Sequence, residues 1–176
     1  MRTITACCAV VAAALTLGSI PAVAAGNLGD VLREAGWDRI IGTWTGANPK
    51  GSQIRITYAW RFKDRVLEIT TRNGEKETVS LVARNPKTGK VFNASADNQG
   101  GSSIGEWKLE DGQTILDLAF VIGDGQEGTL RIRHKLENND ALTVTIDAPE
   151  PVTLKMTRVK SQDSKGPDQP DAGGGK

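Results

Sequence analysis

The segment SQIRITYAWRF, residues 52–62, alternates between apolar side chains and polar or small ones. Side chains two residues apart point to the same face of a β-strand. The alternation therefore predicts a strand with one buried face. That face carries Ile54, Ile56, Tyr58, Trp60 and Phe62.

Similar runs follow along the chain, separated by short turn signals. Asn73-Gly74 and Asp111-Gly112 are typical of tight hairpins, because Gly and Asn tolerate the positive φ that such turns need. Ten strands are expected, the first from Arg39 to Ala47 and the second in residues 52–62. The others are RVLEITTR, ETVSLVAR, KVFNASA, SIGEWKLE, TILDLAFVI, TLRIRHKL, ALTVTI and VTLKMTRV.

Successive hairpins build an antiparallel meander, since parallel strands need long crossover connections. A single open sheet of this size would expose an apolar face and two edges, and closure into an up-and-down barrel removes both. The sequence thus predicts an all-β, antiparallel barrel of about ten strands. A β-sandwich is the alternative, although it normally requires longer Greek-key connections.

A short helix is predicted ahead of the strands, in NLGDVLREAGW, residues 27–37. Asn27 or Asp30 is expected to cap its start, and Gly36 to end it. Four apolar residues are spaced for one helical face: Leu28, Val31, Leu32 and Ala35.

Composition divides the chain into three parts. Residues 1–25 combine Arg2, an apolar run and the small residues Ala22-Val23-Ala24, which is the pattern of a cleavable signal peptide. Residues 161–176 have no large apolar side chain and are rich in Gly, Pro, Asp and Ser, so a disordered tail is expected. The barrel domain is expected over residues 26–160, in a secreted or periplasmic protein without a membrane span.

The cysteine positions indicate how the domain is stabilised, and the net charge indicates which partners it disfavours. Cys7 and Cys8 both lie in the leader, so the domain is expected to have no disulfide and to depend on its hydrophobic core. Arg2 is the leader's only charged residue, which leaves 21 basic and 21 acidic residues in the rest of the chain. This balance argues against a nucleic acid or an anionic membrane as partner, since both select a surplus of Lys and Arg.

The segment IIGTWTG, residues 40–46, follows the predicted helix and opens the meander. It resembles the first strand of the lipocalin and fatty-acid-binding-protein (calycin) superfamily, whose barrels begin with a Gly-x-Trp strand that closes the base. The matching positions are Gly42 and Trp44. The resemblance implies an up-and-down barrel.

Residues 37–159 more closely resemble lipocalin-like domains of unknown function in secreted bacterial proteins. The shared features are Trp60 with Val66-Leu67, Asn85-Pro86 through Gly89-Lys90-Val91, Gly100-Gly101, and Gly105-Glu106-Trp107 with Asp111-Gly112. The chain departs from these domains in the segments ARNP and FNASADNQ. The domains have no established reaction, so the resemblance supports a fold but does not indicate an activity.

The function predicted from this architecture is the binding of a small apolar or amphipathic molecule, without a cofactor or a metal. Barrels of about this size either fill themselves with side chains or hold one small ligand. The residues expected to line the ligand site are Tyr58, Trp60, Phe62, Phe92, Phe120 and His134.

His134 leaves other functions open. It shares a strand face with Ile132 and Leu136, so its imidazole is expected to point into the barrel, most simply as a hydrogen-bonded core histidine. One histidine cannot build a zinc site, but it suffices as the proximal ligand of a haem. A haem-binding barrel is therefore one alternative, and a structural or interaction module of the cell envelope with a filled barrel is another.

The segment GSSIG, residues 101–105, matches the Gly-x-Ser-x-Gly pattern of hydrolase nucleophiles, and Asp117 and His134 follow in the hydrolase order. That pattern works on a sharp strand-to-helix turn. A hairpin turn that leads into another strand is expected here, so we predict that the protein is not an enzyme.

Overall fold

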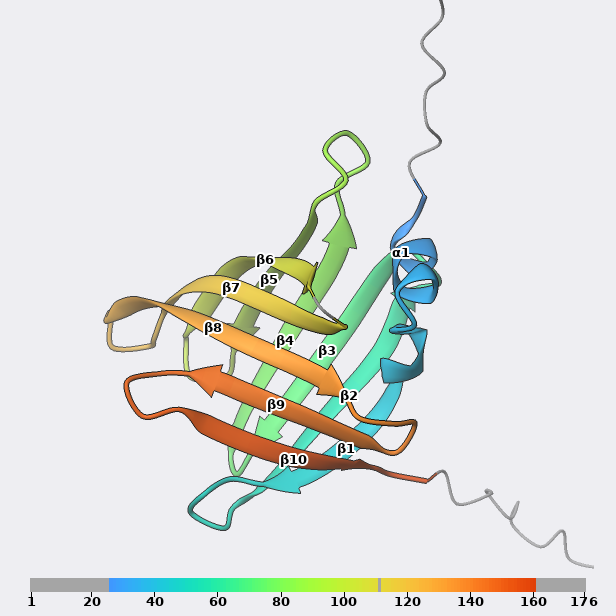
Figure 1. Ribbon diagram of the computed structural model, residues 1–176. Helices are drawn as coiled ribbons and strands as arrows, with labels where there is room; N and C mark the ends of the chain where they lie inside the picture. Colours follow the sequence, from blue (N-terminus) through green and yellow to red (C-terminus); the bar gives the residue numbers. More distant parts are fainter. Residues whose placement is uncertain (1–25, 111, 161–176) are drawn as a thin grey trace, which may run out of the picture.

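The structure is a computed structural model that describes residues 26–110 and 112–160; the predicted signal peptide and the predicted tail lie outside these ranges. The described chain forms a short helix, a 3₁₀ turn and a set of ten strands (Figure 1). In chain order these are α1 (Leu28–Glu34), η1 (Asp38–Ile40), β1 (Gly42–Ala47), β2 (Gln53–Phe62), β3 (Val66–Asn73), β4 (Lys76–Arg84), β5 (Val91–Asp97), β6 (Ser102–Glu110), β7 (Gln113–Val121), β8 (Glu127–Leu136), β9 (Ala141–Asp147) and β10 (Val152–Arg158).

The strands form one closed antiparallel barrel, in which each strand pairs with its neighbours in the sequence. The barrel closes between β1 and β10, where Trp44 lies opposite Arg158 and Thr45 opposite Thr157. This pairing confirms the predicted barrel and rules out the sandwich. A closed sheet also leaves no strand edge open to another chain.

The first strand begins later than predicted. Residues Asp38–Ile40 form a 3₁₀ turn, and β1 starts at Gly42, whose φ is +132°. A Cβ atom at Gly42 would lie 2.6 Å from a guanidinium nitrogen of Arg158, so a side chain there would displace the arginine. Ile40 packs into the core at this end of the barrel instead of continuing the strand.

Trp44 and Arg158 close this end of the barrel together. Trp44 is completely buried, and its indole nitrogen donates a hydrogen bond of 2.8 Å to the carbonyl of Ile40. The guanidinium carbon of Arg158 lies 4.2 Å from the centroid of the Trp44 ring, a distance typical of a cation–π contact. Arg158 also donates to the carbonyls of Ile41 (2.7 Å) and Asn139 (2.6 Å), which ties the end of β10 to two loop segments at the base.

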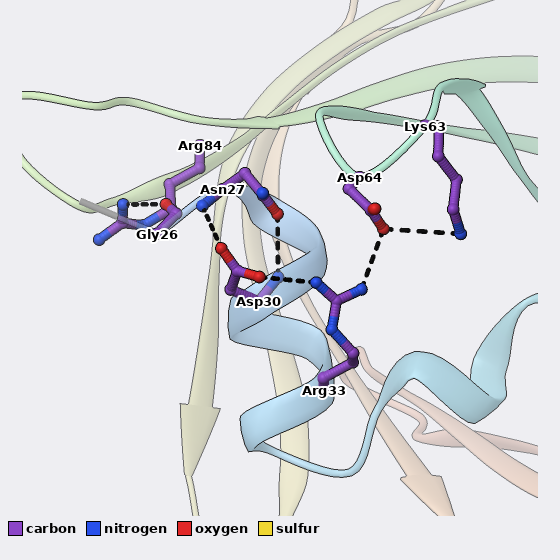
Figure 2. Close-up of polar contacts among 7 residues, drawn as sticks. All are labelled: Gly26, Asn27, Asp30, Arg33, Lys63, Asp64 and Arg84. Carbon is purple, nitrogen blue, oxygen red and sulfur yellow. Dashed lines mark hydrogen bonds and ion pairs between the residues drawn. The ribbon is translucent and has the colours of Figure 1, made fainter. Parts of the chain in front are cut away.

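Helix α1 covers the same end and is fixed by polar contacts, drawn in Figure 2. Asn27 and Asp30 cap its start reciprocally, which confirms the predicted cap. Arg33 pairs with Asp30 (2.6 Å) and with Asp64 (3.1 Å) in the turn between β2 and β3. The carbonyl of Asp64 accepts a hydrogen bond of 2.9 Å from the amide of Gly29, where an added Cβ would lie 2.4 Å from the Asp64 carboxylate.

Replacing Asp64 with Asn is expected to loosen α1. The change removes the carboxylate that faces Arg33 but keeps a residue that tolerates the φ of +60° found here. Exposed ion pairs contribute little, so we expect up to about fivefold faster amide hydrogen exchange in α1 and little change elsewhere. Glu34→Gln, at the exposed end of the helix, is the control, and equal exchange in both variants would contradict a role for the Asp64 carboxylate.

Candidate functional site

The barrel contains a cavity of about 290 Å³, which we call the lumen. This volume lies close to the lower limit of small-molecule sites, which span about 300–1,000 Å³. No residue of α1 lines the lumen among the described residues. It extends from Ile54 and Asn73 near the uncovered end of the barrel to Tyr58 and Trp107 in the interior.

The two sides of the lumen differ in chemistry. Strands β3 to β6 contribute hydroxyl and amide groups: Thr71, Asn73, Thr78, Ser80, Asn93, Ser95 and Ser103. Strands β7 to β10 and β2 contribute aliphatic groups: Leu116, Leu118, Ile132, Val144, Ile146, Leu154, Ile54 and Ile56. Among the described residues, no Asp, Glu, Lys or Arg lines it. The lumen is therefore amphipathic and uncharged.

Tyr58, Ile69 and Trp107 form the floor of the lumen and also line a smaller cavity of about 70 Å³ beneath α1. The smaller cavity is otherwise bounded mainly by apolar groups, among them Leu28 and Trp37. Tyr58 is buried, and burial raises the pKa of its hydroxyl well above its usual range. The floor thus stays uncharged over the physiological pH range.

Four buried polar atoms near this floor have no hydrogen-bond partner in the described part of the chain. They are Asn93 Oδ1, Trp107 Nε1, Thr114 Oγ1 and His134 Nδ1, which we call the polar row. The row crosses four successive strands, β5 to β8, and Thr114 lies directly opposite His134. Most buried polar groups in proteins are paired, so four unpaired atoms on successive strands are unusual.

His134 points into the barrel, as the alternation predicts, and only 6% of it is exposed. Its ring centroid lies 4.9 Å from that of Trp107, with the rings tilted by 41°. Burial lowers the pKa of His134 to about 4, so the imidazole is neutral at neutral pH. The expected core hydrogen bond is not made at Nδ1, because no described residue offers that atom a partner.

The structure brings two of the predicted site residues, Tyr58 and His134, together around the lumen. Trp60 does not line the lumen; it is half-buried and packs against the core, with the Lys63 ammonium 5.5 Å from its ring centroid. Phe120 is also half-buried, opposite Gly128 near the turn between β7 and β8, where it borders a separate hollow.

Phe62 and Phe92 lie on the outside of the barrel, and their predicted place in the lumen is corrected. Phe62 is 63% exposed, because a register shift between Trp60 and Phe62 reverses the alternation at the end of β2. Phe92 is 44% exposed, because its neighbour Asn93 takes the inward position on β5.

The residues of the hydrolase pattern do not assemble into a triad. Ser103 and His134 line the lumen, whereas Asp117 lies on the outer face of β7. There the Asp117 carboxylate is 2.6 Å from Arg131 and 3.0 Å from Lys108, and these hydrogen bonds lower its pKa to about 2. An acid held outside the barrel cannot orient an imidazole inside it.

An apolar area covers part of the outer face of β4 to β7. Its large side chains are between 41% and 67% exposed: Val79, Leu81, Phe92, Ile104 and Val121. Leu81 and Ile104 both pair with Ala94, which makes the area continuous across three strands. Such areas often mark interaction surfaces, so this face bears on the interaction-module alternative.

The inward positions of Asn93 and Thr114 were not predicted from the sequence. The signal that could locate them is register: the turn at Gly112 aligns β6 with β7, and the next hairpin places Thr114 opposite inward His134. On β5 the alternation alone is ambiguous, because an aromatic residue lies on one face and an amide on the other.

No protein-family model and no curated protein matches this sequence. Among solved structures, the crystal structure of Rv2717c from M. tuberculosis is similar, with a TM-score of 0.49 and 16% sequence identity. The alignment covers 73% of this chain and 97% of that chain, and a likeness this weak says nothing about function. None of the described helices is long and apolar enough to cross a membrane.

Proposed function

We propose that this chain is an exported, lipocalin-like barrel that binds one small apolar or amphipathic molecule in its lumen and catalyses no reaction. The observation that carries the proposal is the uncharged cavity of about 290 Å³, whose hydroxyl and amide groups face an aliphatic wall. A site of this kind accepts an apolar body on one side and a polar group on the other. The signal-peptide pattern of residues 1–25 supports the export.

The two alternatives stay predictions with less support. A haem-binding histidine normally donates from its second ring nitrogen to a protein acceptor, and within the described chain Nδ1 of His134 has no partner. A Soret band after haem addition that disappears in His134→Ala would favour the haem alternative. The interaction-module alternative predicts a filled barrel, and the cavity of the lumen disagrees with that prediction. The exposed apolar face of β4 to β7 agrees with this alternative.

Fluorescence titration with N-phenyl-1-naphthylamine, a neutral apolar probe, tests the proposal. We expect saturable binding to the purified protein and at least about tenfold weaker binding to Ser103→Phe, whose ring would occupy the lumen. Ser102→Phe is the matched control, because Ser102 lies on the outer face of the same strand and is exposed. Mass spectrometry of an organic extract would identify any co-purified molecule.

Two results would contradict the proposal. One is the lack of saturable probe binding to the unmodified protein. The other is an equal loss of affinity in Ser103→Phe and Ser102→Phe, which would place the probe outside the barrel.

A further inference from the structure

The polar row lies where the floor of the lumen meets its wall. Asn93 and His134 are 2% and 6% exposed, so both are more than nine-tenths buried, and both line the lumen. Trp107 contacts the His134 ring and lines both cavities, and Thr114 lines the smaller one. Three residues of the row thus lie at the inner end of the lumen, and Thr114 lies on the side of the smaller cavity.

The hydrogen-bonding capacities of the row restrict what can bind there. The indole nitrogen of Trp107 only donates, and the amide oxygen of Asn93 only accepts. The Thr114 hydroxyl and the neutral His134 imidazole can each donate or accept. A partner that satisfies the Nε1 atom of Trp107 and the Oδ1 atom of Asn93 together must accept one hydrogen bond and donate another, which a hydroxyl or a primary amide does.

The charges around the row disfavour an ionised partner. No cationic side chain lines the lumen in the part of the chain that the structure describes. Lys108 borders the smaller cavity, but its ammonium is 3.0 Å from the Asp117 carboxylate on the outer face. A carboxylate at the row would be buried without a counter-charge, and it has no donor for the unpaired Oδ1 atom of Asn93.

We propose that the polar row selects uncharged ligands that carry a hydroxyl or primary amide head on an aliphatic body, and that it excludes carboxylates. The head binds at Asn93, Trp107 and His134, and the aliphatic body lies against β7 to β10. This specificity rests on the proposed function, because it concerns the same lumen.

Competition against bound N-phenyl-1-naphthylamine tests the specificity with four competitors of similar length. Octan-1-ol and 1-methoxyheptane are isomers, but the ether can only accept a hydrogen bond, and octanoate is charged at pH 7. We expect octan-1-ol to bind at least about tenfold more tightly than the ether, and octanoate not to compete at matched concentrations. Octanamide should behave like the alcohol.

Asn93→Leu supplies a second test, because leucine has nearly the same shape and lacks the amide. In this variant the preference for the alcohol over the ether should shrink at least threefold. Ser102→Leu is the control, because Ser102 is exposed on the outer face of β6 and its replacement should leave the preference unchanged. If Asn93→Leu does not fold, the ratio of alcohol to ether affinity in the unmodified protein still decides.

The outcomes separate the two proposals. Probe binding with equal affinities for alcohol and ether, or with octanoate competing as well as the alcohol, would overturn the specificity and leave lumen binding intact. A protein that binds neither the probe nor any of the competitors would overturn the proposed function itself.

Discussion

Replacing Trp44 with Ala is expected to lower the free energy of unfolding by about 3–5 kcal/mol. The side chain is completely buried, its indole nitrogen binds the carbonyl of Ile40, and its ring supports Arg158. The substitution leaves a cavity at the point where β1 meets β10. Because domains are stable by only about 5–15 kcal/mol, this loss is a large part of the total, and the variant should unfold at a markedly lower urea concentration.

Urea denaturation followed by far-ultraviolet circular dichroism measures this loss. Trp60→Ala is the matched control, since it removes the same side chain from a half-buried position on β2. It should cost roughly half as much or less, because less apolar surface is lost from the interior. Equal losses of unfolding free energy in the two variants would contradict a larger stabilising role for Trp44 at the barrel closure.

Acidification is expected to destabilise the protein between pH 6.5 and pH 4 through His134. The unfolded pKa of histidine is near 6.5, and burial lowers the folded value to about 4. Between these values the unfolded chain binds the proton and the folded protein does not, so stability is complete above pH 6.5 and declines as the pH falls. The difference corresponds to about 3 kcal/mol.

Urea denaturation of the unmodified protein and of His134→Gln across this pH range tests the assignment. The variant should lose most of the decline between pH 6.5 and 4, because glutamine does not titrate. Asp117 acts in a different window: its pKa is lowered from 3.8 to about 2, so its contribution is lost only as the pH falls below about 4. An unchanged decline in His134→Gln would contradict burial of a neutral imidazole.

The barrel could be predicted because its determinants are local. Gly74 and Gly112 adopt the positive φ that the hairpin turns require, and each turn aligns the two strands beside it. The start of β1 could not be placed, because the apolar residues Ile40 and Ile41 are equally compatible with a buried strand and with a packed 3₁₀ turn. Local pattern therefore determines the order and pairing of strands more securely than their ends.

The candidate site was only partly predictable, because the inner face of a strand depends on the whole barrel. His134 and Tyr58 share their faces with aliphatic residues, so the alternation places them inside. The predicted inward position of Phe62 is wrong because a register shift precedes it, and this sequence carries no signature of that irregularity. The inward position of Asn93 was missed because β5 places an amide inside and Phe92 outside. This arrangement reverses the usual preference of apolar side chains for the interior.

The pairing of β1 with β10 makes the lumen a property of the completed domain. Trp44 and Arg158 are neighbours across the seam although almost the whole barrel sequence separates them. Contacts between residues so distant in the sequence form late, because a long loop must first be closed. A growing chain therefore has hairpins before it has a lumen, and the lumen exists only after the last strand has joined the first.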